Sequence, residues 1–382
     1  MSIRLETALR VDEQRMGEAI ALARSSLVRV SPNPRVGCVL YHASGQRVAS
    51  GVTEPPGGRH AEIVALEDAR AQGVSLAETT AYVTLEPCAH HGRTAPCVDA
   101  LIQSGIARVC VGVIDPNPLV GGRGIQRLRD AGVIVEIGLL AESCEQLHSP
   151  FFKWIHRGQP WVSLKGAMTL DGCLSTASGQ SQWITGIEAR THVHQLRAQV
   201  DAMMVGGETM RRDRPSLTVR HSEGTDPLPV AVSRRLSLPN DSPILQRSAI
   251  LIHGPDAPEH RREAFSKMGA TLVEVPYLEG HQGQSLDLNA SLKALGALEI
   301  THLCVEGGGA LHGSFLTAGL IDDLYLYIAP KLIGRGKPLF NFPSVAHMSE
   351  GWLLEGVQTT QLGSDLHIYG RFVHHQADTV EG

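Results

Sequence analysis

The chain has 382 residues, of which 42% are hydrophobic and 19% are charged, and its net charge is −5. At about 100–200 residues per domain, this length predicts two or three domains. The negative charge argues against a nucleic-acid-binding protein that relies on a broad basic face. No apolar run approaches the ~18–20 residues of a membrane span, and the amphipathic first twenty residues lack the apolar core of a signal peptide. We therefore expect a cytoplasmic protein with neither nucleic acid nor membrane as a partner.

The first half of the chain alternates helical and extended patterns. An amphipathic helix is predicted within residues 1–30, and Pro32 and Pro34 exclude its continuation. The segments that follow are predicted strands at 36–42, 47–53, 81–87, 108–115 and 133–140, and predicted helices at 61–73, 98–105, 124–132 and 141–159. Alternating β and α units of this length predict a layered sheet that is covered by helices.

A second β/α series begins at residues 160–172. Its further predicted strands lie at 201–207, 228–233, 249–254, 271–276 and 301–309, and residues 324–333 and 365–373 alternate like antiparallel strands. We therefore predict two α/β domains, residues 1–147 and 148–375. The polar tail at 376–382 is predicted to be disordered.

The cysteines point away from a disulfide framework. There are seven, an odd and scattered set, and a reducing compartment disfavours disulfides. Cys38, Cys110 and Cys304 lie in apolar strand patterns, so we expect them to be buried thiols. Cys88 and Cys97 bracket the loop of TLEPCAHHGRTAPC, residues 84–97. A disulfide, a metal site and a substrate loop are the alternatives for this pair.

The motif HAE at residues 60–62 favours a metal site. A hydrolytic zinc needs three protein ligands and one open position for water, and His60, Cys88 and Cys97 supply such a set. Glu62 would lie near the metal and could shuttle protons, as in zinc nucleobase deaminases. A structural zinc would need a fourth ligand, which His90 or His91 could provide, so that alternative stays open.

The spacing of the two cysteines departs from the general deaminase pattern. That pattern is H-x-E followed by P-C-x-x-C, whereas eight residues separate Cys88 from Cys97. The longer gap weakens the hypothesis of a nucleoside or tRNA-base deaminase. It fits an enzyme whose substrate lies against the intervening loop.

A glycine-rich run marks the second half. VEGGGALHGSFLTAGL, residues 305–320, reads as a strand, three glycines and a helix. Glycines at such a turn let backbone amides approach a pyrophosphate at the helix N-terminus. The spacing is not G-x-G-x-x-G, and a tight packing turn is the alternative.

Several motifs together resemble one family. PNPRVGCV, HAE, TLEPCAHHGRTAPC and DPNPLVGGRGIQRLRDAG are similar to the deaminase half of the bifunctional riboflavin-biosynthesis deaminase–reductases, whose own cysteine spacing is the eight-residue gap. SLKGAMTLDG, SGQSQWIT, MRRDRPSLTVR and the glycine-rich run resemble the reductase half. The resemblance extends from about residue 11 to about residue 372. It implies a cytidine-deaminase-like α/β/α layered domain followed by a dihydrofolate-reductase-like α/β domain.

The resemblance also implies chemistry and partners. The first half would use one Zn²⁺ per chain to deaminate a phosphoribosylated diaminopyrimidine to a uracil. The second would use NADPH to reduce the ribose of that product to a ribityl chain. A homo-oligomer is expected from the resemblance alone.

Carried over by position, the resemblance implies three sets of contacts. The deaminase substrate would contact Asn33, His90, Arg93 and Thr94. The nucleotide would contact Ala167, Trp183, Thr209, Asp213, Ser233, Gly308 and Gly309. The reductase substrate would contact Ser181, Arg197, Leu217, Arg220 and Glu306. For Asn33, which lies between two prolines, turn chemistry is the alternative, and for Trp183 it is a place in the core.

Physical roles agree with these assignments. Arg197 and Arg220 can offer guanidinium groups to a phosphate. Glu306 could hydrogen-bond sugar hydroxyls, and Lys165 could supply a proton or polarise the sugar carbonyl.

Two positions depart from the reductase pattern. Arg214 and Val232 stand where the family commonly has acids, and both border the expected nucleotide site. A deaminase with a degenerate reductase half therefore stays an alternative. A non-catalytic zinc-binding regulatory derivative is another, although it would have no need of Glu62. Arg234 and Arg235 are candidates for the 2′-phosphate of the cofactor, with an ordinary charged surface as the alternative.

Overall fold

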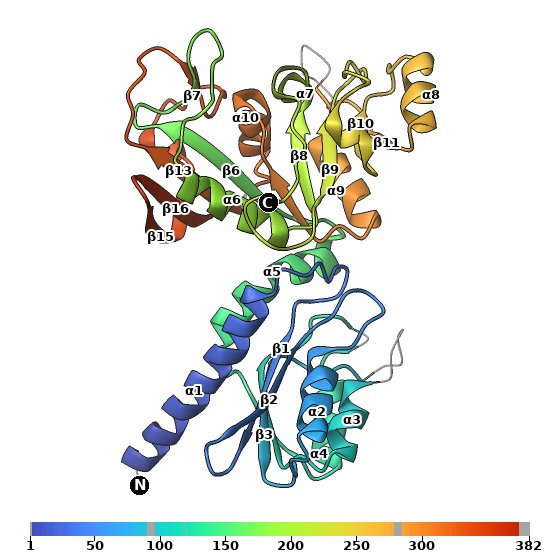
Figure 1. The fold of residues 1–382 in the computed structure, drawn as a ribbon, viewed down its shortest axis with the longest axis vertical. Coiled ribbons are helices and arrows are strands. Elements are labelled where there is room, and N and C mark those ends of the chain that lie inside the picture. The colour runs from blue at the N-terminus through green and yellow to red at the C-terminus, as the bar shows by residue number, and fades with distance from the viewer. Residues whose placement is uncertain (1, 90–95, 119, 279–284, 374–382) are drawn as a thin grey trace, which may run out of the picture. The chain divides into compact units, whose positions relative to one another are not determined.

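The computed structural model describes residues 2–89, 96–118, 120–278 and 285–373. The chain divides into two compact units, Met1–Gly158 and Gln159–Gly382 (Figure 1). The border expected at residue 147 falls inside helix α5 (Ala141–Arg157), which belongs to the first unit. The tail at 376–382 lies outside the described residues. Among the described residues, no helix has the length and apolar character needed to cross a membrane.

The first unit is built on a five-stranded sheet with the order β2-β1-β3-β4-β5. β1 pairs antiparallel with β2 and β3, while β3, β4 and β5 are parallel. The strands are β1 (Gly37–His42), β2 (Arg47–Val52), β3 (Thr79–Leu85), β4 (Arg108–Val113) and β5 (Ile134–Ile137). All five strands expected from the sequence are confirmed, and β5 is shorter than predicted.

Helices cover both faces of this sheet (Figure 1). α2 (Ala61–Ala71), α3 (Cys97–Gln103) and α4 (Arg123–Asp130) pack on one face, and α1 (Ser2–Ser25) packs on the other. Alternate residues of a strand point to opposite faces, and the two cores follow this rule. Leu40 and Val83 contact the core under α2 to α4, whereas Val39 and Tyr82 contact the core under α1.

The second unit contains a nine-stranded sheet with the order β11-β10-β9-β8-β12-β6-β13-β16-β15. The strands from β11 to β13 are parallel to their neighbours, and β16 and β15 are antiparallel additions. The strands are β6 (Trp161–Thr169), β8 (Ala202–Gly206), β9 (Leu228–Val232), β10 (Ile250–His253), β11 (Thr271–Glu274), β12 (His302–Val305), β13 (Asp323–Ala329), β15 (Leu354–Leu362) and β16 (Asp365–Phe372). A small separate sheet pairs β7 (Cys173–Ser175) with β14 (Lys337–Pro338). The antiparallel pairing of β13 with β16 confirms the prediction from their alternation.

Two apolar cores lie on the two faces of the large sheet. Helices α6 (Ile187–Gln199), α7 (Gly207–Asp213) and α8 (Glu259–Lys267) contribute to one core, and α9 (Leu288–Ala297) and α10 (Gly309–Thr317) contribute to the other. The carboxyl ends of the parallel strands β6, β8, β9 and β12 meet at one edge, where ligands bind in open α/β sheets. The buried thiols expected at Cys38, Cys110 and Cys304 are confirmed, and each is 0% exposed.

Candidate active sites

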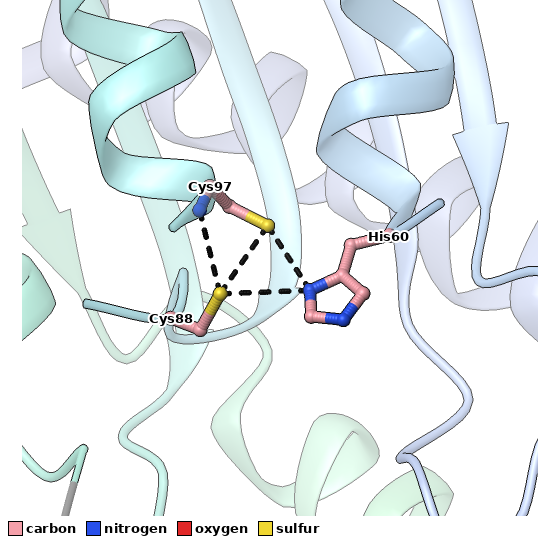
Figure 2. A group of neighbouring side chains, drawn as sticks. All are labelled: His60, Cys88 and Cys97. Carbon is pink, nitrogen blue, oxygen red and sulfur yellow. Dashed lines mark hydrogen bonds between the residues drawn. The ribbon is translucent and has the colours of Figure 1, made fainter. Parts of the chain in front are cut away.

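Three side chains of the first unit converge on one point (Figure 2). His60 precedes the first turn of α2, Cys88 follows the end of β3, and Cys97 is the first residue of α3. The His60 Nδ1 atom lies 3.1 Å from the Cys97 Sγ atom and 3.5 Å from the Cys88 Sγ atom. The two sulfur atoms are 3.4 Å apart. Both cysteines are free thiols, so the disulfide alternative for this pair does not hold in the structure.

The chemistry of this group fits zinc. Two thiols and one imidazole nitrogen are typical zinc ligands, and bonds of about 2.0–2.3 Å would place tetrahedral ligand atoms roughly 3.5–3.8 Å apart. Hydrogen bonds from Cys97 and the proximity of His60 hold the pKa of the Cys88 thiol at about 4, so that this sulfur is a thiolate at neutral pH. Among the residues that the structure describes, this is the one group that could hold a metal ion. A fourth ligand from His90 or His91 falls outside those residues.

Glu62 lies beside the three ligands but is not part of the group. It occupies the first turn of α2 and is 4% exposed. Burial, together with the negative charge of Cys88, raises the pKa of the Glu62 carboxyl to about 7. A carboxyl group in such an environment can both accept and release a proton near neutral pH.

A cavity of about 300 Å³ opens onto His60, Glu62 and Cys88. Asn33, one of the predicted substrate contacts, lies in its lining, whereas His90, Arg93 and Thr94 lie outside the described residues. Other lining residues were not singled out from the sequence, and they include Asp115, Asn117, Phe151, Trp154 and Ile155. The motif DPNP, just after β4, was the available signal for the first two, because polar residues that follow a parallel strand gather at the ligand-binding edge.

A second cluster joins three charged side chains of the second unit. The Glu306 Oε1 atom accepts a hydrogen bond from the Lys165 Nζ atom at 2.9 Å, and its Oε2 atom accepts one from the Arg197 Nη2 atom at 2.7 Å. Burial opposes ionisation of Glu306, but the charges of Arg197 and Lys165 hold the pKa of its carboxyl well below the usual range. Lys165 comes from β6, Arg197 from α6, and Glu306 directly follows β12.

The described contacts of Arg197 lie within the protein, and its role toward a substrate phosphate stays a prediction. Its Nη1 atom donates to the carbonyl of Thr218 at 3.1 Å, and its Nη2 atom donates to Glu306. Two nitrogen atoms of the guanidinium group are therefore engaged within the protein. Arg220 is exposed, and its Nη1 atom donates to the Ser216 hydroxyl at 2.6 Å.

Trp183 lies at the surface, with 62% of the residue exposed. It is therefore not the core tryptophan of the alternative hypothesis. The Arg190 guanidinium lies 4.5 Å from the centre of its ring, and the Lys331 amino group donates to the carbonyls of Trp183 at 2.8 Å and of Ile184 at 2.7 Å. These contacts present a flat, fixed aromatic face to solvent.

The ends of β8, β9 and β12 bring together part of the predicted nucleotide site. A Cβ atom built on Gly308 would meet only the Thr209 hydroxyl, at 3.9 Å, and one built on Gly207 would lie 3.4 Å from the Ser233 side chain. Gly309 differs, because its Cβ atom would lie 2.6 Å from the carbonyl oxygen of Pro338. The glycine at 309 is thus required for close packing, whereas Gly308 faces Thr209.

The other residues predicted to contact the nucleotide or the reductase substrate lie in different elements and differ in burial. The Leu217 side chain is 2% exposed and packs in a core, so that a contact with substrate would have to come from its backbone. Asp213 ends α7, Ala167 lies in β6, and Ser181 lies in the segment before α6.

The two residues that depart from the reductase pattern lie at element ends. Arg214 follows α7 and forms an ion pair with Asp241 at 2.5 Å, so its charge is balanced outside the Lys165–Glu306 cluster. Val232 is the last residue of β9. Arg234 and Arg235 follow it, and each lies within 3.8 Å of Asp256 while keeping 41% and 53% of its side chain exposed.

Comparison with known proteins identifies both halves. Residues 160–368 match the family model of the RibD C-terminal domain, and residues 9–113 match the cytidine and deoxycytidylate deaminase zinc-binding region. The riboflavin biosynthesis protein RibD of Actinobacillus pleuropneumoniae is 40% identical over 358 residues, which cover 92% of this chain and 93% of the relative. The Escherichia coli K12 protein of the same name is 37% identical over 94% of this chain and 99% of its own length.

Solved structures agree with this assignment over nearly the whole chain. Acinetobacter baumannii RibD superposes with a TM-score of 0.84 at 35% identity, covering 96% of this chain and 99% of that one. A Thermotoga maritima diaminohydroxyphosphoribosylaminopyrimidine deaminase/5-amino-6-(5-phosphoribosylamino)uracil reductase gives a TM-score of 0.82 at 32% identity, covering 96% of this chain and all of that one. The fold class predicted from the sequence, a cytidine-deaminase-like unit followed by a reductase unit, is confirmed.

Proposed function

Because the chain belongs to the RibD family of bifunctional riboflavin-biosynthesis deaminase–reductases, we propose that it catalyses two consecutive steps on one phosphoribosylated pyrimidine. The first step is hydrolytic deamination of 2,5-diamino-6-ribosylamino-4(3H)-pyrimidinone 5′-phosphate. The second is NADPH-dependent reduction of 5-amino-6-(5-phosphoribosylamino)uracil to the ribitylamino compound. The relative from Thermotoga maritima carries both activities in its name.

The observation that carries the first step is the group of zinc ligands around a cavity that also contains a buried carboxyl. His60, Cys88 and Cys97 would hold the ion. Zinc bound in this way lowers the pKa of a coordinated water and so supplies a nucleophile at neutral pH. Glu62 would take a proton from that water and pass it to the departing amino group, since its side chain is buried beside the ligands and lines the cavity.

The cavity also explains how a pyrimidine could be held. Asn33, Asp115 and Asn117 offer polar groups to the edge of a heterocycle. Phe151 and Trp154 offer apolar faces from α5. A mostly apolar cavity with a few directed polar groups is typical of a small-molecule site.

The observation that carries the second step is the Lys165–Glu306–Arg197 cluster beside the glycine-rich turn. NADPH would supply the hydride. We infer that Lys165 donates a proton to the carbonyl oxygen of the opened ribose, since the hydrogen bond to Glu306 at 2.9 Å fixes the position of its amino group. Thr209, Ser233 and Gly308 would contact the nucleotide, and Trp183 would lie against one of its rings. The homo-oligomeric state stays a prediction.

The experiment for the deaminase is a Glu62→Gln substitution. We expect zinc to be retained and ammonia release to fall by about 10²–10⁴-fold, the usual effect of a general acid–base group. NADPH oxidation with the deaminated intermediate should be unchanged. The matched control is Glu67→Gln on the same helix, where the carboxyl is exposed and paired with Arg59. Wild-type ammonia release in Glu62→Gln would remove Glu62 from the mechanism.

A further inference from the structure

Glu86 has an unusual set of partners for a side chain beside a metal-ligand turn. It lies between the end of β3 and Cys88 and is 3% exposed. Its Oε2 atom accepts hydrogen bonds from the backbone N–H groups of Gly122 at 2.9 Å and Asp115 at 3.3 Å. Its Oε1 atom accepts from those of Gly124 at 3.0 Å and Ile125 at 3.3 Å. One carboxylate therefore satisfies four backbone donors.

These bonds give the buried carboxylate a stable environment. A buried charge is costly unless it is paired or hydrogen-bonded. Gly124 and Ile125 are in the first turn of α4, where N–H groups have no partner within the helix and the helix dipole favours negative charge. The residue at the start of α4, Gly122, offers no side chain to cap it. Glu86 takes that role from a distant part of the chain.

The same bonds join two walls of the deaminase cavity. Cys88 and Glu86 itself line the cavity on the side of β3, and Asp115, Asn117 and Val120 line it from the segment after β4. That segment is internally tied, since the Asn117 N–H group donates to the Asp115 carboxylate at 2.8 Å and the Val120 N–H group donates to the Asn117 carbonyl at 2.8 Å. Glu86 holds both ends of it, at Asp115 and at Gly122.

Packing beside Glu86 is equally close. A Cβ atom on Gly124 would lie 2.1 Å from the carbonyl oxygen of Pro87, the residue between Glu86 and Cys88. The start of α4 therefore lies directly against the turn that carries the zinc ligand. A shift of α4 or of its carboxylate anchor would be passed to Cys88 through one peptide unit.

We propose that Glu86 is a positioning residue of the deaminase site. It sets the separation between the Cys88 ligand and the cavity wall of Asp115, Asn117 and Val120, and it acts through the backbone N–H groups that its two carboxylate oxygens bind. The proposal deepens the proposed deaminase function and rests on it.

The test is Glu86→Gln in the full-length zinc-loaded enzyme. Glutamine keeps the size of the side chain but cannot accept with its amide nitrogen, so two of the four N–H groups lose their acceptor. Supporting partners of metal ligands typically change metal affinity or activity by about 10–100-fold. We expect the rate of zinc transfer to a chromophoric chelator and the KM for deamination each to rise by about tenfold or more. NADPH oxidation with the deaminated intermediate should stay at the wild-type rate.

A control separates positioning from general loss of stability. Asp12 is a half-buried carboxylate of the same unit that binds Arg108 and Tyr82 and does not line the cavity. Asp12→Asn should lower the melting temperature and leave zinc transfer and KM unchanged. Glu86→Gln with wild-type zinc transfer and KM, or with changes equal to those of Asp12→Asn, would overturn the proposal.

Two further outcomes remain decisive. If Glu86→Gln does not fold, Glu86→Asp is measured in the same way, and a raised zinc transfer rate supports the proposal while a wild-type rate overturns it. If wild-type enzyme releases no ammonia, the proposed deaminase function fails. Zinc transfer from Glu86→Gln still tests the positioning role in that case.

Discussion

The two candidate sites of this chain balance their charges in opposite ways. The first gathers two thiols, an imidazole and a buried carboxyl around a cavity, and this set needs a cation to be complete. The second gathers Lys165, Arg197 and Glu306, where one carboxylate pairs with two cations within the protein and one positive charge is left over. The first site is therefore organised to hold an ion, and the second is already charged and ordered before any ligand arrives. Under the proposed function, one chain would use a metal for one reaction and fixed protein charges for the other.

The largest expected effect comes from removing one ligand of the first site. Cys88→Ala leaves two protein ligands, so zinc should be lost and ammonia release should fall by more than ~10³-fold, because no acidified water remains. Zinc content and ammonia release measure this. Cys144→Ala, which removes a buried thiol outside the group, should keep both. Full ammonia release from zinc-free Cys88→Ala would show that the first site does not depend on a metal ion.

The matching change in the second site is Glu306→Gln. It leaves the buried cations of Lys165 and Arg197 without their partner, which costs about 3–5 kcal/mol when a buried ion pair is broken. Chemical unfolding of the second unit and NADPH oxidation measure the result, and both should fall while ammonia release persists. An unchanged free energy of unfolding would show that the cluster is solvated.

The pH dependence of stability should show how much the Glu306 carboxylate stabilises the second unit. The folded-state pKa of Glu306 lies below its usual value of 4.5, so its carboxylate stabilises the fold above that pH. This contribution is lost as the pH falls below about 4.5 toward the folded-state value. Wild type should therefore lose more stability than Glu306→Gln between about pH 6 and pH 3. Chemical unfolding of wild type and of Glu306→Gln across this pH range measures the difference. Plots of the free energy of unfolding against pH that run parallel for the two proteins would contradict the prediction.

The smallest effect is expected at the edge of the second site. The side chain of Arg234 is 41% exposed, and its nearest Asp256 oxygen is 3.7 Å away, which is too long for a hydrogen bond. Its guanidinium group could therefore donate hydrogen bonds to a phosphate. Arg234→Ala should lower the preference for NADPH over NADH by about tenfold, in line with ~1.5–3 kcal/mol for a hydrogen bond to a charged group. Ratios of kcat/KM for the two cofactors measure this. Arg262→Ala on α8, where the guanidinium pairs with Glu259 and Glu274, serves as the control. An unchanged ratio in Arg234→Ala would assign Arg234 to the charged surface.

The first site could be predicted from the sequence because its parts lie at recognisable junctions. His60 and Cys97 stand at the starts of helices and Cys88 follows a strand, and His60 and Cys97 are only 37 positions apart in the chain. The aromatic residues Phe151 and Trp154 could not be assigned to the cavity. Their apolar character predicts burial, but it does not say which cavity their helix faces.

The contacts between the side chains of the second site could not be predicted from local sequence patterns, because they depend on the strand order of the fold. Lys165 and Glu306 are 141 residues apart, and Arg197 and Glu306 are 109 apart. They meet because β12 inserts between β8 and β6, and no local pattern encodes that order. Strand β15 was missed for a different reason. It is an edge strand whose residues are almost all exposed, so it lacks the alternation that marks a half-buried strand.

The place of β6 in its sheet has a consequence for synthesis of the chain. β6 is central and apolar, yet its two neighbours, β12 and β13, begin only at His302 and Asp323. At about 5–20 residues per second, a ribosome needs on the order of ten seconds to supply them. The first unit can complete its sheet within that interval, whereas β6 must wait with unpaired edges. We expect nascent chains that stop before residue 302 to depend on chaperones, although their N-terminal unit is already folded.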